Sequence, residues 1–251
     1  MSATSPSTTR LVLLQSGFDL RLLLRNGEQF LLTILIPVGL LVGLTLATAV
    51  PLTIAPGASR VDTALAGVLA VAVLSSAFTS LAIGLGFDRR SGALLLLATT
   101  PLSRTSILAA RALATFATVA LQAVILAVTA TFLGWRPESG DLLALPLLLL
   151  GTLALGSLGF ALAGAIRAEA TLAVANAVFL LLLVGGGTAW PTSSLPGPLA
   201  AVVAALPSAA LGDSLRAVVA AGPASIPVAI LLLVVWTIAG VLIAKRTFRW
   251  S

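Results

Sequence analysis

Few residues in this chain could take part in covalent or metal chemistry. The 251 residues include no cysteine, histidine or tyrosine, and 14 lysines and arginines stand against 8 acids. The chain therefore lacks thiolate nucleophiles, imidazole bases and the commonest ligands of transition metals. It also lacks the Gly-x-x-x-x-Gly-Lys-Ser/Thr pattern that holds nucleotide phosphates. We expect no catalytic residue, metal or cofactor in this chain, and these absences exclude most enzyme classes.

One segment, residues 88–104, is charged at its start and apolar afterwards. Its candidate functional residues are Asp88, Arg89, Arg90, Gly92, Leu95, Leu96 and Pro101. The apolar run Ala93–Ala98 is too short to cross a bilayer, so lipid or another protein must cover it. A short helix after Gly92 would present its leucines as a docking surface, with the arginines at its base for acidic partners. The residues favour equally a second interpretation, in which the arginines anchor membrane helices and the leucines lie in the interface.

Polar side chains also occur inside the long apolar runs. They are Ser75, Ser76, Thr79, Ser80, Gln122, Ser157 and Asn176. Any of them could line a path through the membrane. Such groups also join membrane helices by hydrogen bonds worth about 0.6 to 2 kcal/mol, and this structural role is the more frequent one. Ser76, Thr79, Ser80, Gln122 and Asn176 are our candidates for lining a path.

Membrane-spanning helices must position these residues. Of all residues 59% are hydrophobic and 9% are charged, whereas soluble domains are about 25% charged, so the chain requires lipid as its solvent. Six stretches of suitable length predict spans: 30–50, 64–87, 107–133, 142–166, 170–189 and 226–244. We therefore expect a single-domain, all-α polytopic membrane protein over residues 1–251, with a short helix between its second and third spans.

The positive charges predict the orientation. Six spans place both termini on one side, and that side carries eleven lysines and arginines against three on the other, Arg60, Arg136 and Arg216. Cytoplasmic loops carry an excess of lysine and arginine. We therefore expect a multi-pass protein of the cell membrane with both termini and residues 88–104 in the cytoplasm.

Two further segments complete this plan. Residues 10–28 combine leucines with Arg21 and Arg25 one turn apart, which predicts an interfacial helix; a ragged cytoplasmic start of the first span is the alternative. Residues 190–225 contain five prolines around two apolar pieces, neither of which is a convincing span. Two re-entrant half-helices on the outer face are the economical interpretation, because irregular backbone at membrane depth needs polar partners.

Together these motifs resemble the membrane subunit of ABC-2 type ABC exporters, a class that includes daunorubicin-type drug-resistance permeases of actinobacteria. The runs Asp88-Arg89-Arg90-Ser91-Gly92 and Thr100-Pro101-Leu102-Ser103 are similar to a signature of that family between its second and third helices. Residues 10–28 resemble its amphipathic connecting helix, and residues 190–225 resemble its re-entrant region. Family members often keep an acid shortly after the glycine, where this chain has leucines.

The resemblance implies a division of labour between subunits. This chain would form the translocation path, while ATP and Mg²⁺ would bind a separate ATPase subunit that docks on residues 88–104. Two permeases, either two copies or this chain with a paralogue, and two ATPase subunits would make the working unit. The resemblance also implies export of a drug, an antibiotic or a lipid from the cytoplasm.

Other classes of function fit the residues less well. We expect a hydrophobic or amphipathic substrate and no nucleic acid, because the spans have no ionisable residue near their middle for a strongly polar solute. A secondary transporter of a small hydrophobic solute, the main alternative, predicts paired ionisable residues at the midplane and broken spans. A haem-exporter type of permease usually lacks the long proline-rich outer segment. An intramembrane enzyme needs convergent acids, bases or metal ligands.

Overall fold

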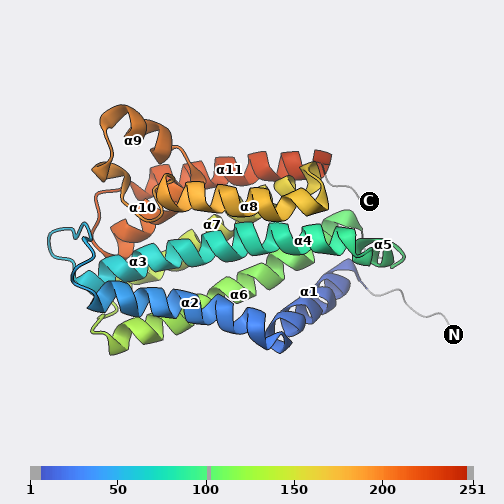
Figure 1. Cartoon of the computed structure of the whole chain (residues 1–251), viewed down its shortest axis with the longest axis horizontal. Coiled ribbons are helices and arrows are strands. Elements are labelled where there is room, and N and C mark those ends of the chain that lie inside the picture. Colours follow the sequence, from blue (N-terminus) through green and yellow to red (C-terminus); the bar gives the residue numbers. More distant parts are fainter. Residues whose placement is uncertain (1–6, 101–102, 248–251) are drawn as a thin grey trace.

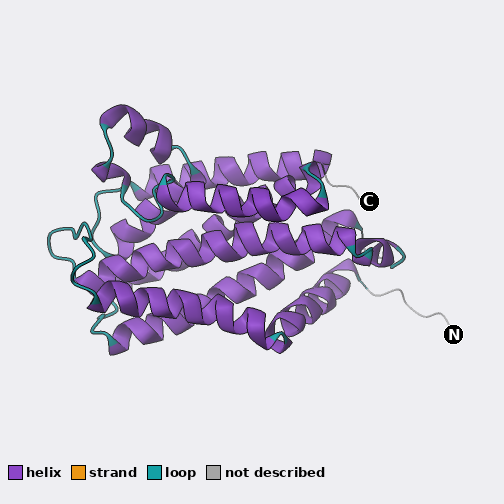
Figure 2. Cartoon of the chain, viewed as in Figure 1, coloured by secondary structure: helices purple, strands orange, loops and turns teal. Residues whose placement is uncertain are grey.

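The computed structural model describes residues 7–100 and 103–247, so the predicted site residue Pro101 lies outside the described part. The described residues form helices joined by short loops, with no strand among them (Figure 2). Most of the helices lie side by side along the long axis of the molecule (Figure 1). The chain is therefore a helical bundle.

A continuous helix of 31 residues runs through the centre of the bundle. It consists of α3 (Arg60–Val73), the π-helical segment η1 (Leu74–Ser80) and α4 (Leu81–Arg90). Ser59 caps its start, because the Ser59 hydroxyl accepts from the N–H of Asp62 and the Asp62 carboxylate accepts from the N–H of Ser59. In its most apolar stretch 72% of the residues are buried, so the other helices surround it.

Longer helices complete the bundle. They are α1 (Thr8–Arg25), α2 (Gly27–Leu46), α6 (Arg104–Phe132), α7 (Ala144–Ala165), α8 (Ala168–Val184) and α11 (Ile226–Thr247). Of these, α2, α6, α7 and α8 pack against the central helix, whereas α1 packs mainly against α6 and α11 against α7. Shorter elements are α5 (Ala93–Ala98), α9 (Gly197–Ala204), α10 (Pro207–Val219) and the 3₁₀ turns η2 (Ser139–Leu143) and η3 (Thr192–Ser194). The start of α1, the helix α5 and the end of α11 lie at one end of the bundle, and α9 lies at the other (Figure 1).

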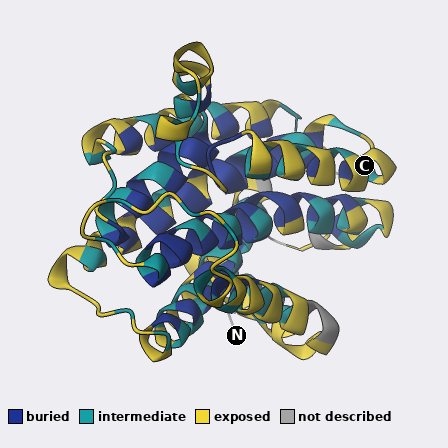
Figure 3. Ribbon diagram, turned by 60° about the vertical axis from the view of Figure 1, so that its left-hand side comes forward, coloured by how far each residue is buried: buried dark blue, intermediate teal, exposed yellow. Residues whose placement is uncertain are grey.

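The outward-facing surface of the bundle is apolar. Exposed residues follow the outer sides of the peripheral helices, and buried residues lie inside (Figure 3). Among the four segments long and apolar enough to cross a membrane, α11 contains the most apolar stretch, but only 17% of that stretch is buried. Its Leu231 and Val235 are 63% and 52% exposed. A bundle in water would cover such a face, whereas lipid solvates it. The structure thus confirms an all-α polytopic membrane protein.

The number of spans depends on how two bent helix pairs are counted. Among the described residues, four segments are long and apolar enough to cross a membrane: Arg60–Arg90, Thr105–Phe132, Ser139–Ala165 and Ile226–Thr247. The count becomes six if α1 with α2, bent by 71°, and α9 with α10, bent by 96°, each cross once. The six spans predicted from the sequence instead include α2 and the 17-residue α8, each as one span. The roles of these individual helices stay predictions.

Two helices, α2 and α8, end about a turn or more before the predicted ends of their spans. Helix α2 ends at Leu46, and the guanidinium of Arg60 donates to the carbonyls of Leu44, Ala47 and Val50 at 2.8, 2.6 and 2.8 Å. Arg60 thereby gives a donor to one carbonyl in the last turn of α2, which the end of the helix leaves without an intrahelical partner, and to two carbonyls of the loop that follows. Helix α8 ends at Val184, where three glycines of low helix propensity follow.

The proline-rich segment forms one buried and one projecting helix. Ten of the 13 residues of α10 are buried, whereas Val203 is the buried residue of α9, which projects from the bundle (Figure 1). Arg216 of α10 is 6% exposed and donates to the carbonyl of Thr188 at 3.1 Å and to Asp213 at 2.7 Å. This polar anchor ties α10 to the loop that follows α8.

Candidate functional site

The short helix α5 projects from the end of α4. Gly92 turns the chain between them with φ of +77°, a conformation that other residues rarely adopt, and its carbonyl accepts from the N–H groups of Leu95 and Leu96 at 3.0 and 3.2 Å. Leu94 is 1% exposed and belongs to an apolar cluster with Phe160 of α7. Leu95 and Leu96 remain 52% and 72% exposed. One leucine therefore attaches α5 to the bundle while the next two face outward.

Two of the three charged residues before α5 make contacts inside the chain. Asp88 forms an ion pair with Arg111 of α6. Arg89 donates to the carbonyls of Ala163, at 2.8 Å, and Ile166, at the C-terminal end of α7. Arg90 is the exposed member of the three. Asp88 and Arg89 thus fix the helix that carries α5, and Arg90 keeps an exposed guanidinium beside it.

Arg111 connects three helices at this end of the bundle. Besides Asp88 of α4, the Arg111 Nε lies 3.6 Å from the carboxylate of Asp19 on α1. The pKa of Asp19 is raised, chiefly because the carboxyl group is buried, and the negative charge of Asp88 adds to this effect. The charge of Arg111 and a hydrogen bond from Gln15 at 2.8 Å oppose it. We call Asp19, Asp88 and Arg111 the Arg111 cluster. It ties the N-terminal helix to the helix that ends at α5.

Helix α1 contacts α6 through a mixed face. Ser16 is its buried residue, and Asp19 lies one turn further along. Two leucines of this helix, Leu13 and Leu24, are 56% and 45% exposed. Their exposure supports a position against lipid, and the interfacial role of α1 stays a prediction.

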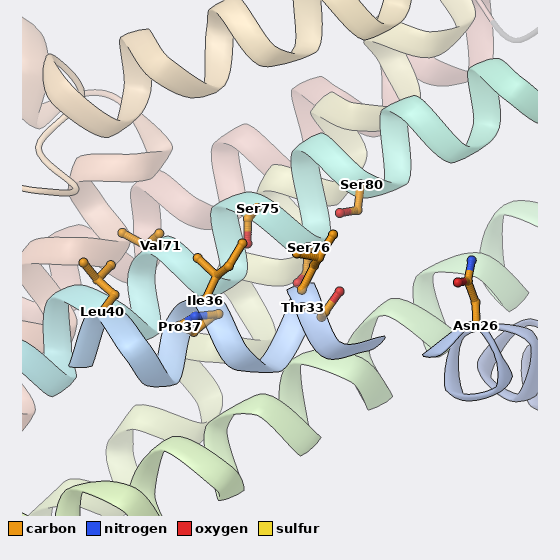
Figure 4. Close-up of a pocket in the computed structure, with 10 residues that line it drawn as sticks. Asn26, Thr33, Ile36, Pro37, Leu40, Val71, Ser75, Ser76 and Ser80 are labelled. Carbon is orange, nitrogen blue, oxygen red and sulfur yellow. The ribbon is translucent and has the colours of Figure 1, made fainter. Parts of the chain in front are cut away.

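A polar hollow lies between α2 and the π-helical segment. Two cavities of about 510 and 430 Å³ share Asn26, Thr33, Ser76 and Ser80 in their walls. Figure 4 shows side chains of α2 facing those of the central helix across the first cavity. The second cavity extends to the Arg111 cluster. The polar hollow therefore reaches from the middle of the central helix to the end that carries α5.

Gln122 joins three helices beside this hollow. It is 2% exposed; its Oε1 accepts from the Ser76 hydroxyl at 3.0 Å, and its Nε2 donates to the carbonyl of Thr33 at 2.9 Å. In a regular helix the Thr33 carbonyl would accept from the N–H of residue 37, but Pro37 has none. Gln122 replaces the missing donor and so connects α2, η1 and α6. Gln122 lines neither cavity, and its role along a path stays a prediction.

The other candidate residues separate into two groups. Ser76, which is 6% exposed, and Ser80, which is exposed, line the hollow. Thr79 does not line either cavity; it is 9% exposed, and its hydroxyl has no partner in the described part of the chain. Asn176 is exposed on α8 and lines neither cavity. Thr33 also lines the hollow and is not among the predicted residues, although its position four residues before Pro37 is a signal for a free carbonyl.

The π-helical segment is held from behind by α7. A Cβ atom at Gly159 would lie 2.9 Å from the carbonyl oxygen of Phe78 and 3.2 Å from that of Ala77, so only glycine permits this approach. Single π-helical turns within α-helices occur frequently at functional sites. Segment η1 therefore has its back fixed against α7 and presents Ser76 and Ser80 to the hollow.

One comparison with known proteins gives a match. A family model described as ABC-2 family transporter protein matches residues 49–245, which is more than half of the chain. No curated protein matches the chain. The matched residues include the central helix, α5 and the α6 wall of the hollow, and they leave out α1 and α2.

Proposed function

Because the chain belongs to the ABC-2 family of transporter proteins, we propose that it is the permease subunit of an ATP-driven exporter of a hydrophobic or amphipathic substrate. The match over residues 49–245 carries this proposal. Membrane domains of this family are permease subunits, are not themselves ATPases, and normally pair with an ATPase subunit. The substrate is a drug, an antibiotic or a lipid that leaves the cytoplasm across the cell membrane.

The ATPase subunit docks on α5. Leu95 and Leu96 are exposed at the end of the bundle, and apolar side chains of this kind are suited to a groove on a partner protein. Leu94 and the internal bonds of Asp88 and Arg89 support the proposal, because they fix the base of α5 so that a push on it moves the bundle. ATP and Mg²⁺ bind the partner subunit.

The substrate passes along the polar hollow. The wall of the first cavity combines apolar side chains such as Ile36 and Leu40 with the hydroxyls of Ser75, Ser76 and Ser80, and no charged residue is among the described side chains that line it. Such a wall suits a molecule with a large apolar surface and a few hydrogen-bonding groups. A strongly charged solute would find no partner in the described wall of this first cavity.

A second copy of the chain packs against α8. Asn176 is exposed halfway along this helix, between the small exposed residues Ala173 and Ala177. A carboxamide in hydrocarbon without a hydrogen-bond partner is costly, and small residues allow two helices to approach closely. Two copies related by a twofold axis would pair their Asn176 side chains, which removes this cost.

The orientation is tested by cysteine labelling, for which the chain is well suited because it contains no native cysteine. Ser91, before α5, and Ser193, before α9, are both exposed. With a membrane-impermeant maleimide, Ser193→Cys should react in intact cells and Ser91→Cys only after permeabilisation. The reverse pattern would show that α5 faces outward and would exclude docking of a cytoplasmic ATPase.

The function is tested by purification in mild detergent from the source cells. We expect a subunit with a nucleotide-binding sequence to co-purify in near-equal amount and to hydrolyse ATP. The pair, reconstituted in vesicles, should move a fluorescent amphipathic dye only with ATP present. A chain that purifies alone under several gentle conditions, and that moves the dye with an ion gradient instead of ATP, would be a secondary transporter.

A further inference from the structure

A basic cavity lies at the end of the bundle near α5, separate from the polar hollow. Its volume is about 540 Å³, and its walls are the end of α4, the turn between α7 and α8, and the end of α11. Two contacts fix these walls. Arg89 donates to the carbonyl of Ala163 at 2.8 Å, and the Thr247 hydroxyl lies 3.4 Å from the carbonyl of Ala161. The cavity is therefore built by packed helix ends.

Arginines from three separate segments meet in this cavity. Besides Arg89, they are Arg90, Arg167 and Arg246, and Glu169 is the acid in the wall. Arg90, Arg167 and Arg246 are exposed, and within the described ranges none of the three forms an ion pair. Several guanidinium groups around one opening attract an anion, and they match a phosphate group in geometry.

Apolar side chains continue from the cavity along both neighbouring helices. Leu172 of α8, one turn from Glu169, is 45% exposed, and Leu242 and Ile243 of α11, one turn from Arg246, are 53% and 46% exposed. A charged pocket beside exposed leucines matches a phospholipid, whose phosphate would lie among the arginines and whose acyl chains would follow the leucines. An acidic peptide or a free phosphate would use the charges and leave the apolar flank uncovered.

We propose that Arg167 and Arg246 bind the headgroup of an anionic phospholipid in this cavity. The proposal rests on the proposed orientation, which places the cavity at the cytoplasmic leaflet, where anionic lipids attract basic groups between membrane helices. Arg90 adds positive charge but also lies beside α5, so we leave it unchanged in the test. The bound lipid joins the ends of α4, α7 and α11 that surround the base of α5.

The experiment measures lipid binding to the purified full chain in detergent by native mass spectrometry. Phosphatidylglycerol and phosphatidylcholine are the probes, and inorganic phosphate is the competitor. Arg167→Gln with Arg246→Gln should weaken phosphatidylglycerol binding about 30-fold. The control, Arg21→Gln with Arg25→Gln, removes the same amount of charge from exposed positions on α1 and should leave the binding of phosphatidylglycerol nearly unchanged. Arg167→Lys with Arg246→Lys should retain most of the binding and shows that the fold tolerates both positions.

Each remaining outcome would overturn the proposal. Equal binding of both lipids by the unaltered chain would show that no headgroup is selected. Full competition by millimolar phosphate would assign the cavity to a free anion. Loss of the ATPase subunit from the glutamine variant, with lipid binding intact, would make the arginines a protein-docking surface. Lipid binding in detergent does not depend on orientation, so the labelling of Ser91 and Ser193 can fail separately.

Discussion

Replacing Leu95 and Leu96 together by alanine tests whether α5 is the docking element. The change shortens two exposed side chains and leaves the buried anchor Leu94 in place. Alanine has the highest helix propensity, so α5 keeps its conformation. We therefore expect normal membrane insertion and normal stability, with weaker binding of the ATPase subunit and loss of ATP-driven transport.

The expected size of the effect follows from exposure. Leu95 and Leu96 are 52% and 72% exposed, so docking can bury slightly more than the equivalent of one whole leucine side chain. Full burial of a leucine stabilises by about 1.5 to 3 kcal/mol. The double replacement should therefore cost about 2 to 4 kcal/mol of binding free energy, which raises the dissociation constant about 30-fold to 1,000-fold.

The assay is equilibrium binding of the purified ATPase subunit to the permease in detergent. The matched control replaces Leu142 and Leu143 by alanine, because these leucines are 66% and 52% exposed in η2 at the other end of the bundle. Leu94→Ala is the contrasting variant; it removes a buried side chain and should lower the unfolding free energy by about 2 to 5 kcal/mol.

An unchanged dissociation constant would refute the docking role of α5. It would favour the alternative in which Leu95 and Leu96 lie in the lipid interface, because α5 would then make no contact that alanine removes. If the Leu142 and Leu143 control weakened binding of the ATPase subunit equally, the effect would come from a general loss of apolar surface. That result would also contradict the assignment of α5 as the docking element.

Three further predictions concern contacts between helices. Gln122→Leu should lower the unfolding free energy by about 1 to 3 kcal/mol in chemical denaturation. The loss should be smaller in a chain that also carries Pro37→Ala, because the alanine restores a backbone N–H for the Thr33 carbonyl. An equal loss with and without Pro37→Ala would contradict the inference that Gln122 replaces the missing backbone donor. Arg111→Met should loosen α1 and speed the maleimide labelling of a cysteine at the buried position Ser16, whereas an unaltered labelling rate would show that the Arg111 cluster does not hold α1. Asn176→Cys should form a disulfide between two copies in oxidised membranes, and a chain that stays monomeric would place the second copy elsewhere.

The helices could be predicted from the sequence because they depend on local patterns. Long apolar runs require lipid, and prolines, glycines and charges mark their ends. The short helix after Gly92 follows the same rule, since a glycine precedes an apolar run that a proline ends. Even the weaker spans, such as residues 170–189, contain a helix, although α8 ends at Val184.

The contacts of single polar residues could not be predicted, because they join distant parts of the chain. Arg89 and Arg60 look alike in the sequence, as positive charges near the ends of spans. In the structure both donate to carbonyls at the ends of other helices, and Arg89 reaches Ala163, 74 residues away. Gln122 similarly reaches Thr33, 89 residues away. Charge counting uses these residues for orientation and does not indicate their partners.

The central helix connects the polar hollow with α5. From η1 at the hollow, the helix runs without a break to Arg90, and Gly92 then turns it into α5. At its base, Asp88 binds α6 and Arg89 binds α7, so a displacement of α5 would act on these two helices and on the central helix together. The π-helical segment is where the regular hydrogen-bond pattern of this helix changes, and it forms the wall of the hollow with Ser76 and Ser80. We therefore expect the movement of a docked ATPase to reshape the hollow at η1, the point at which an amphipathic substrate would contact the central helix.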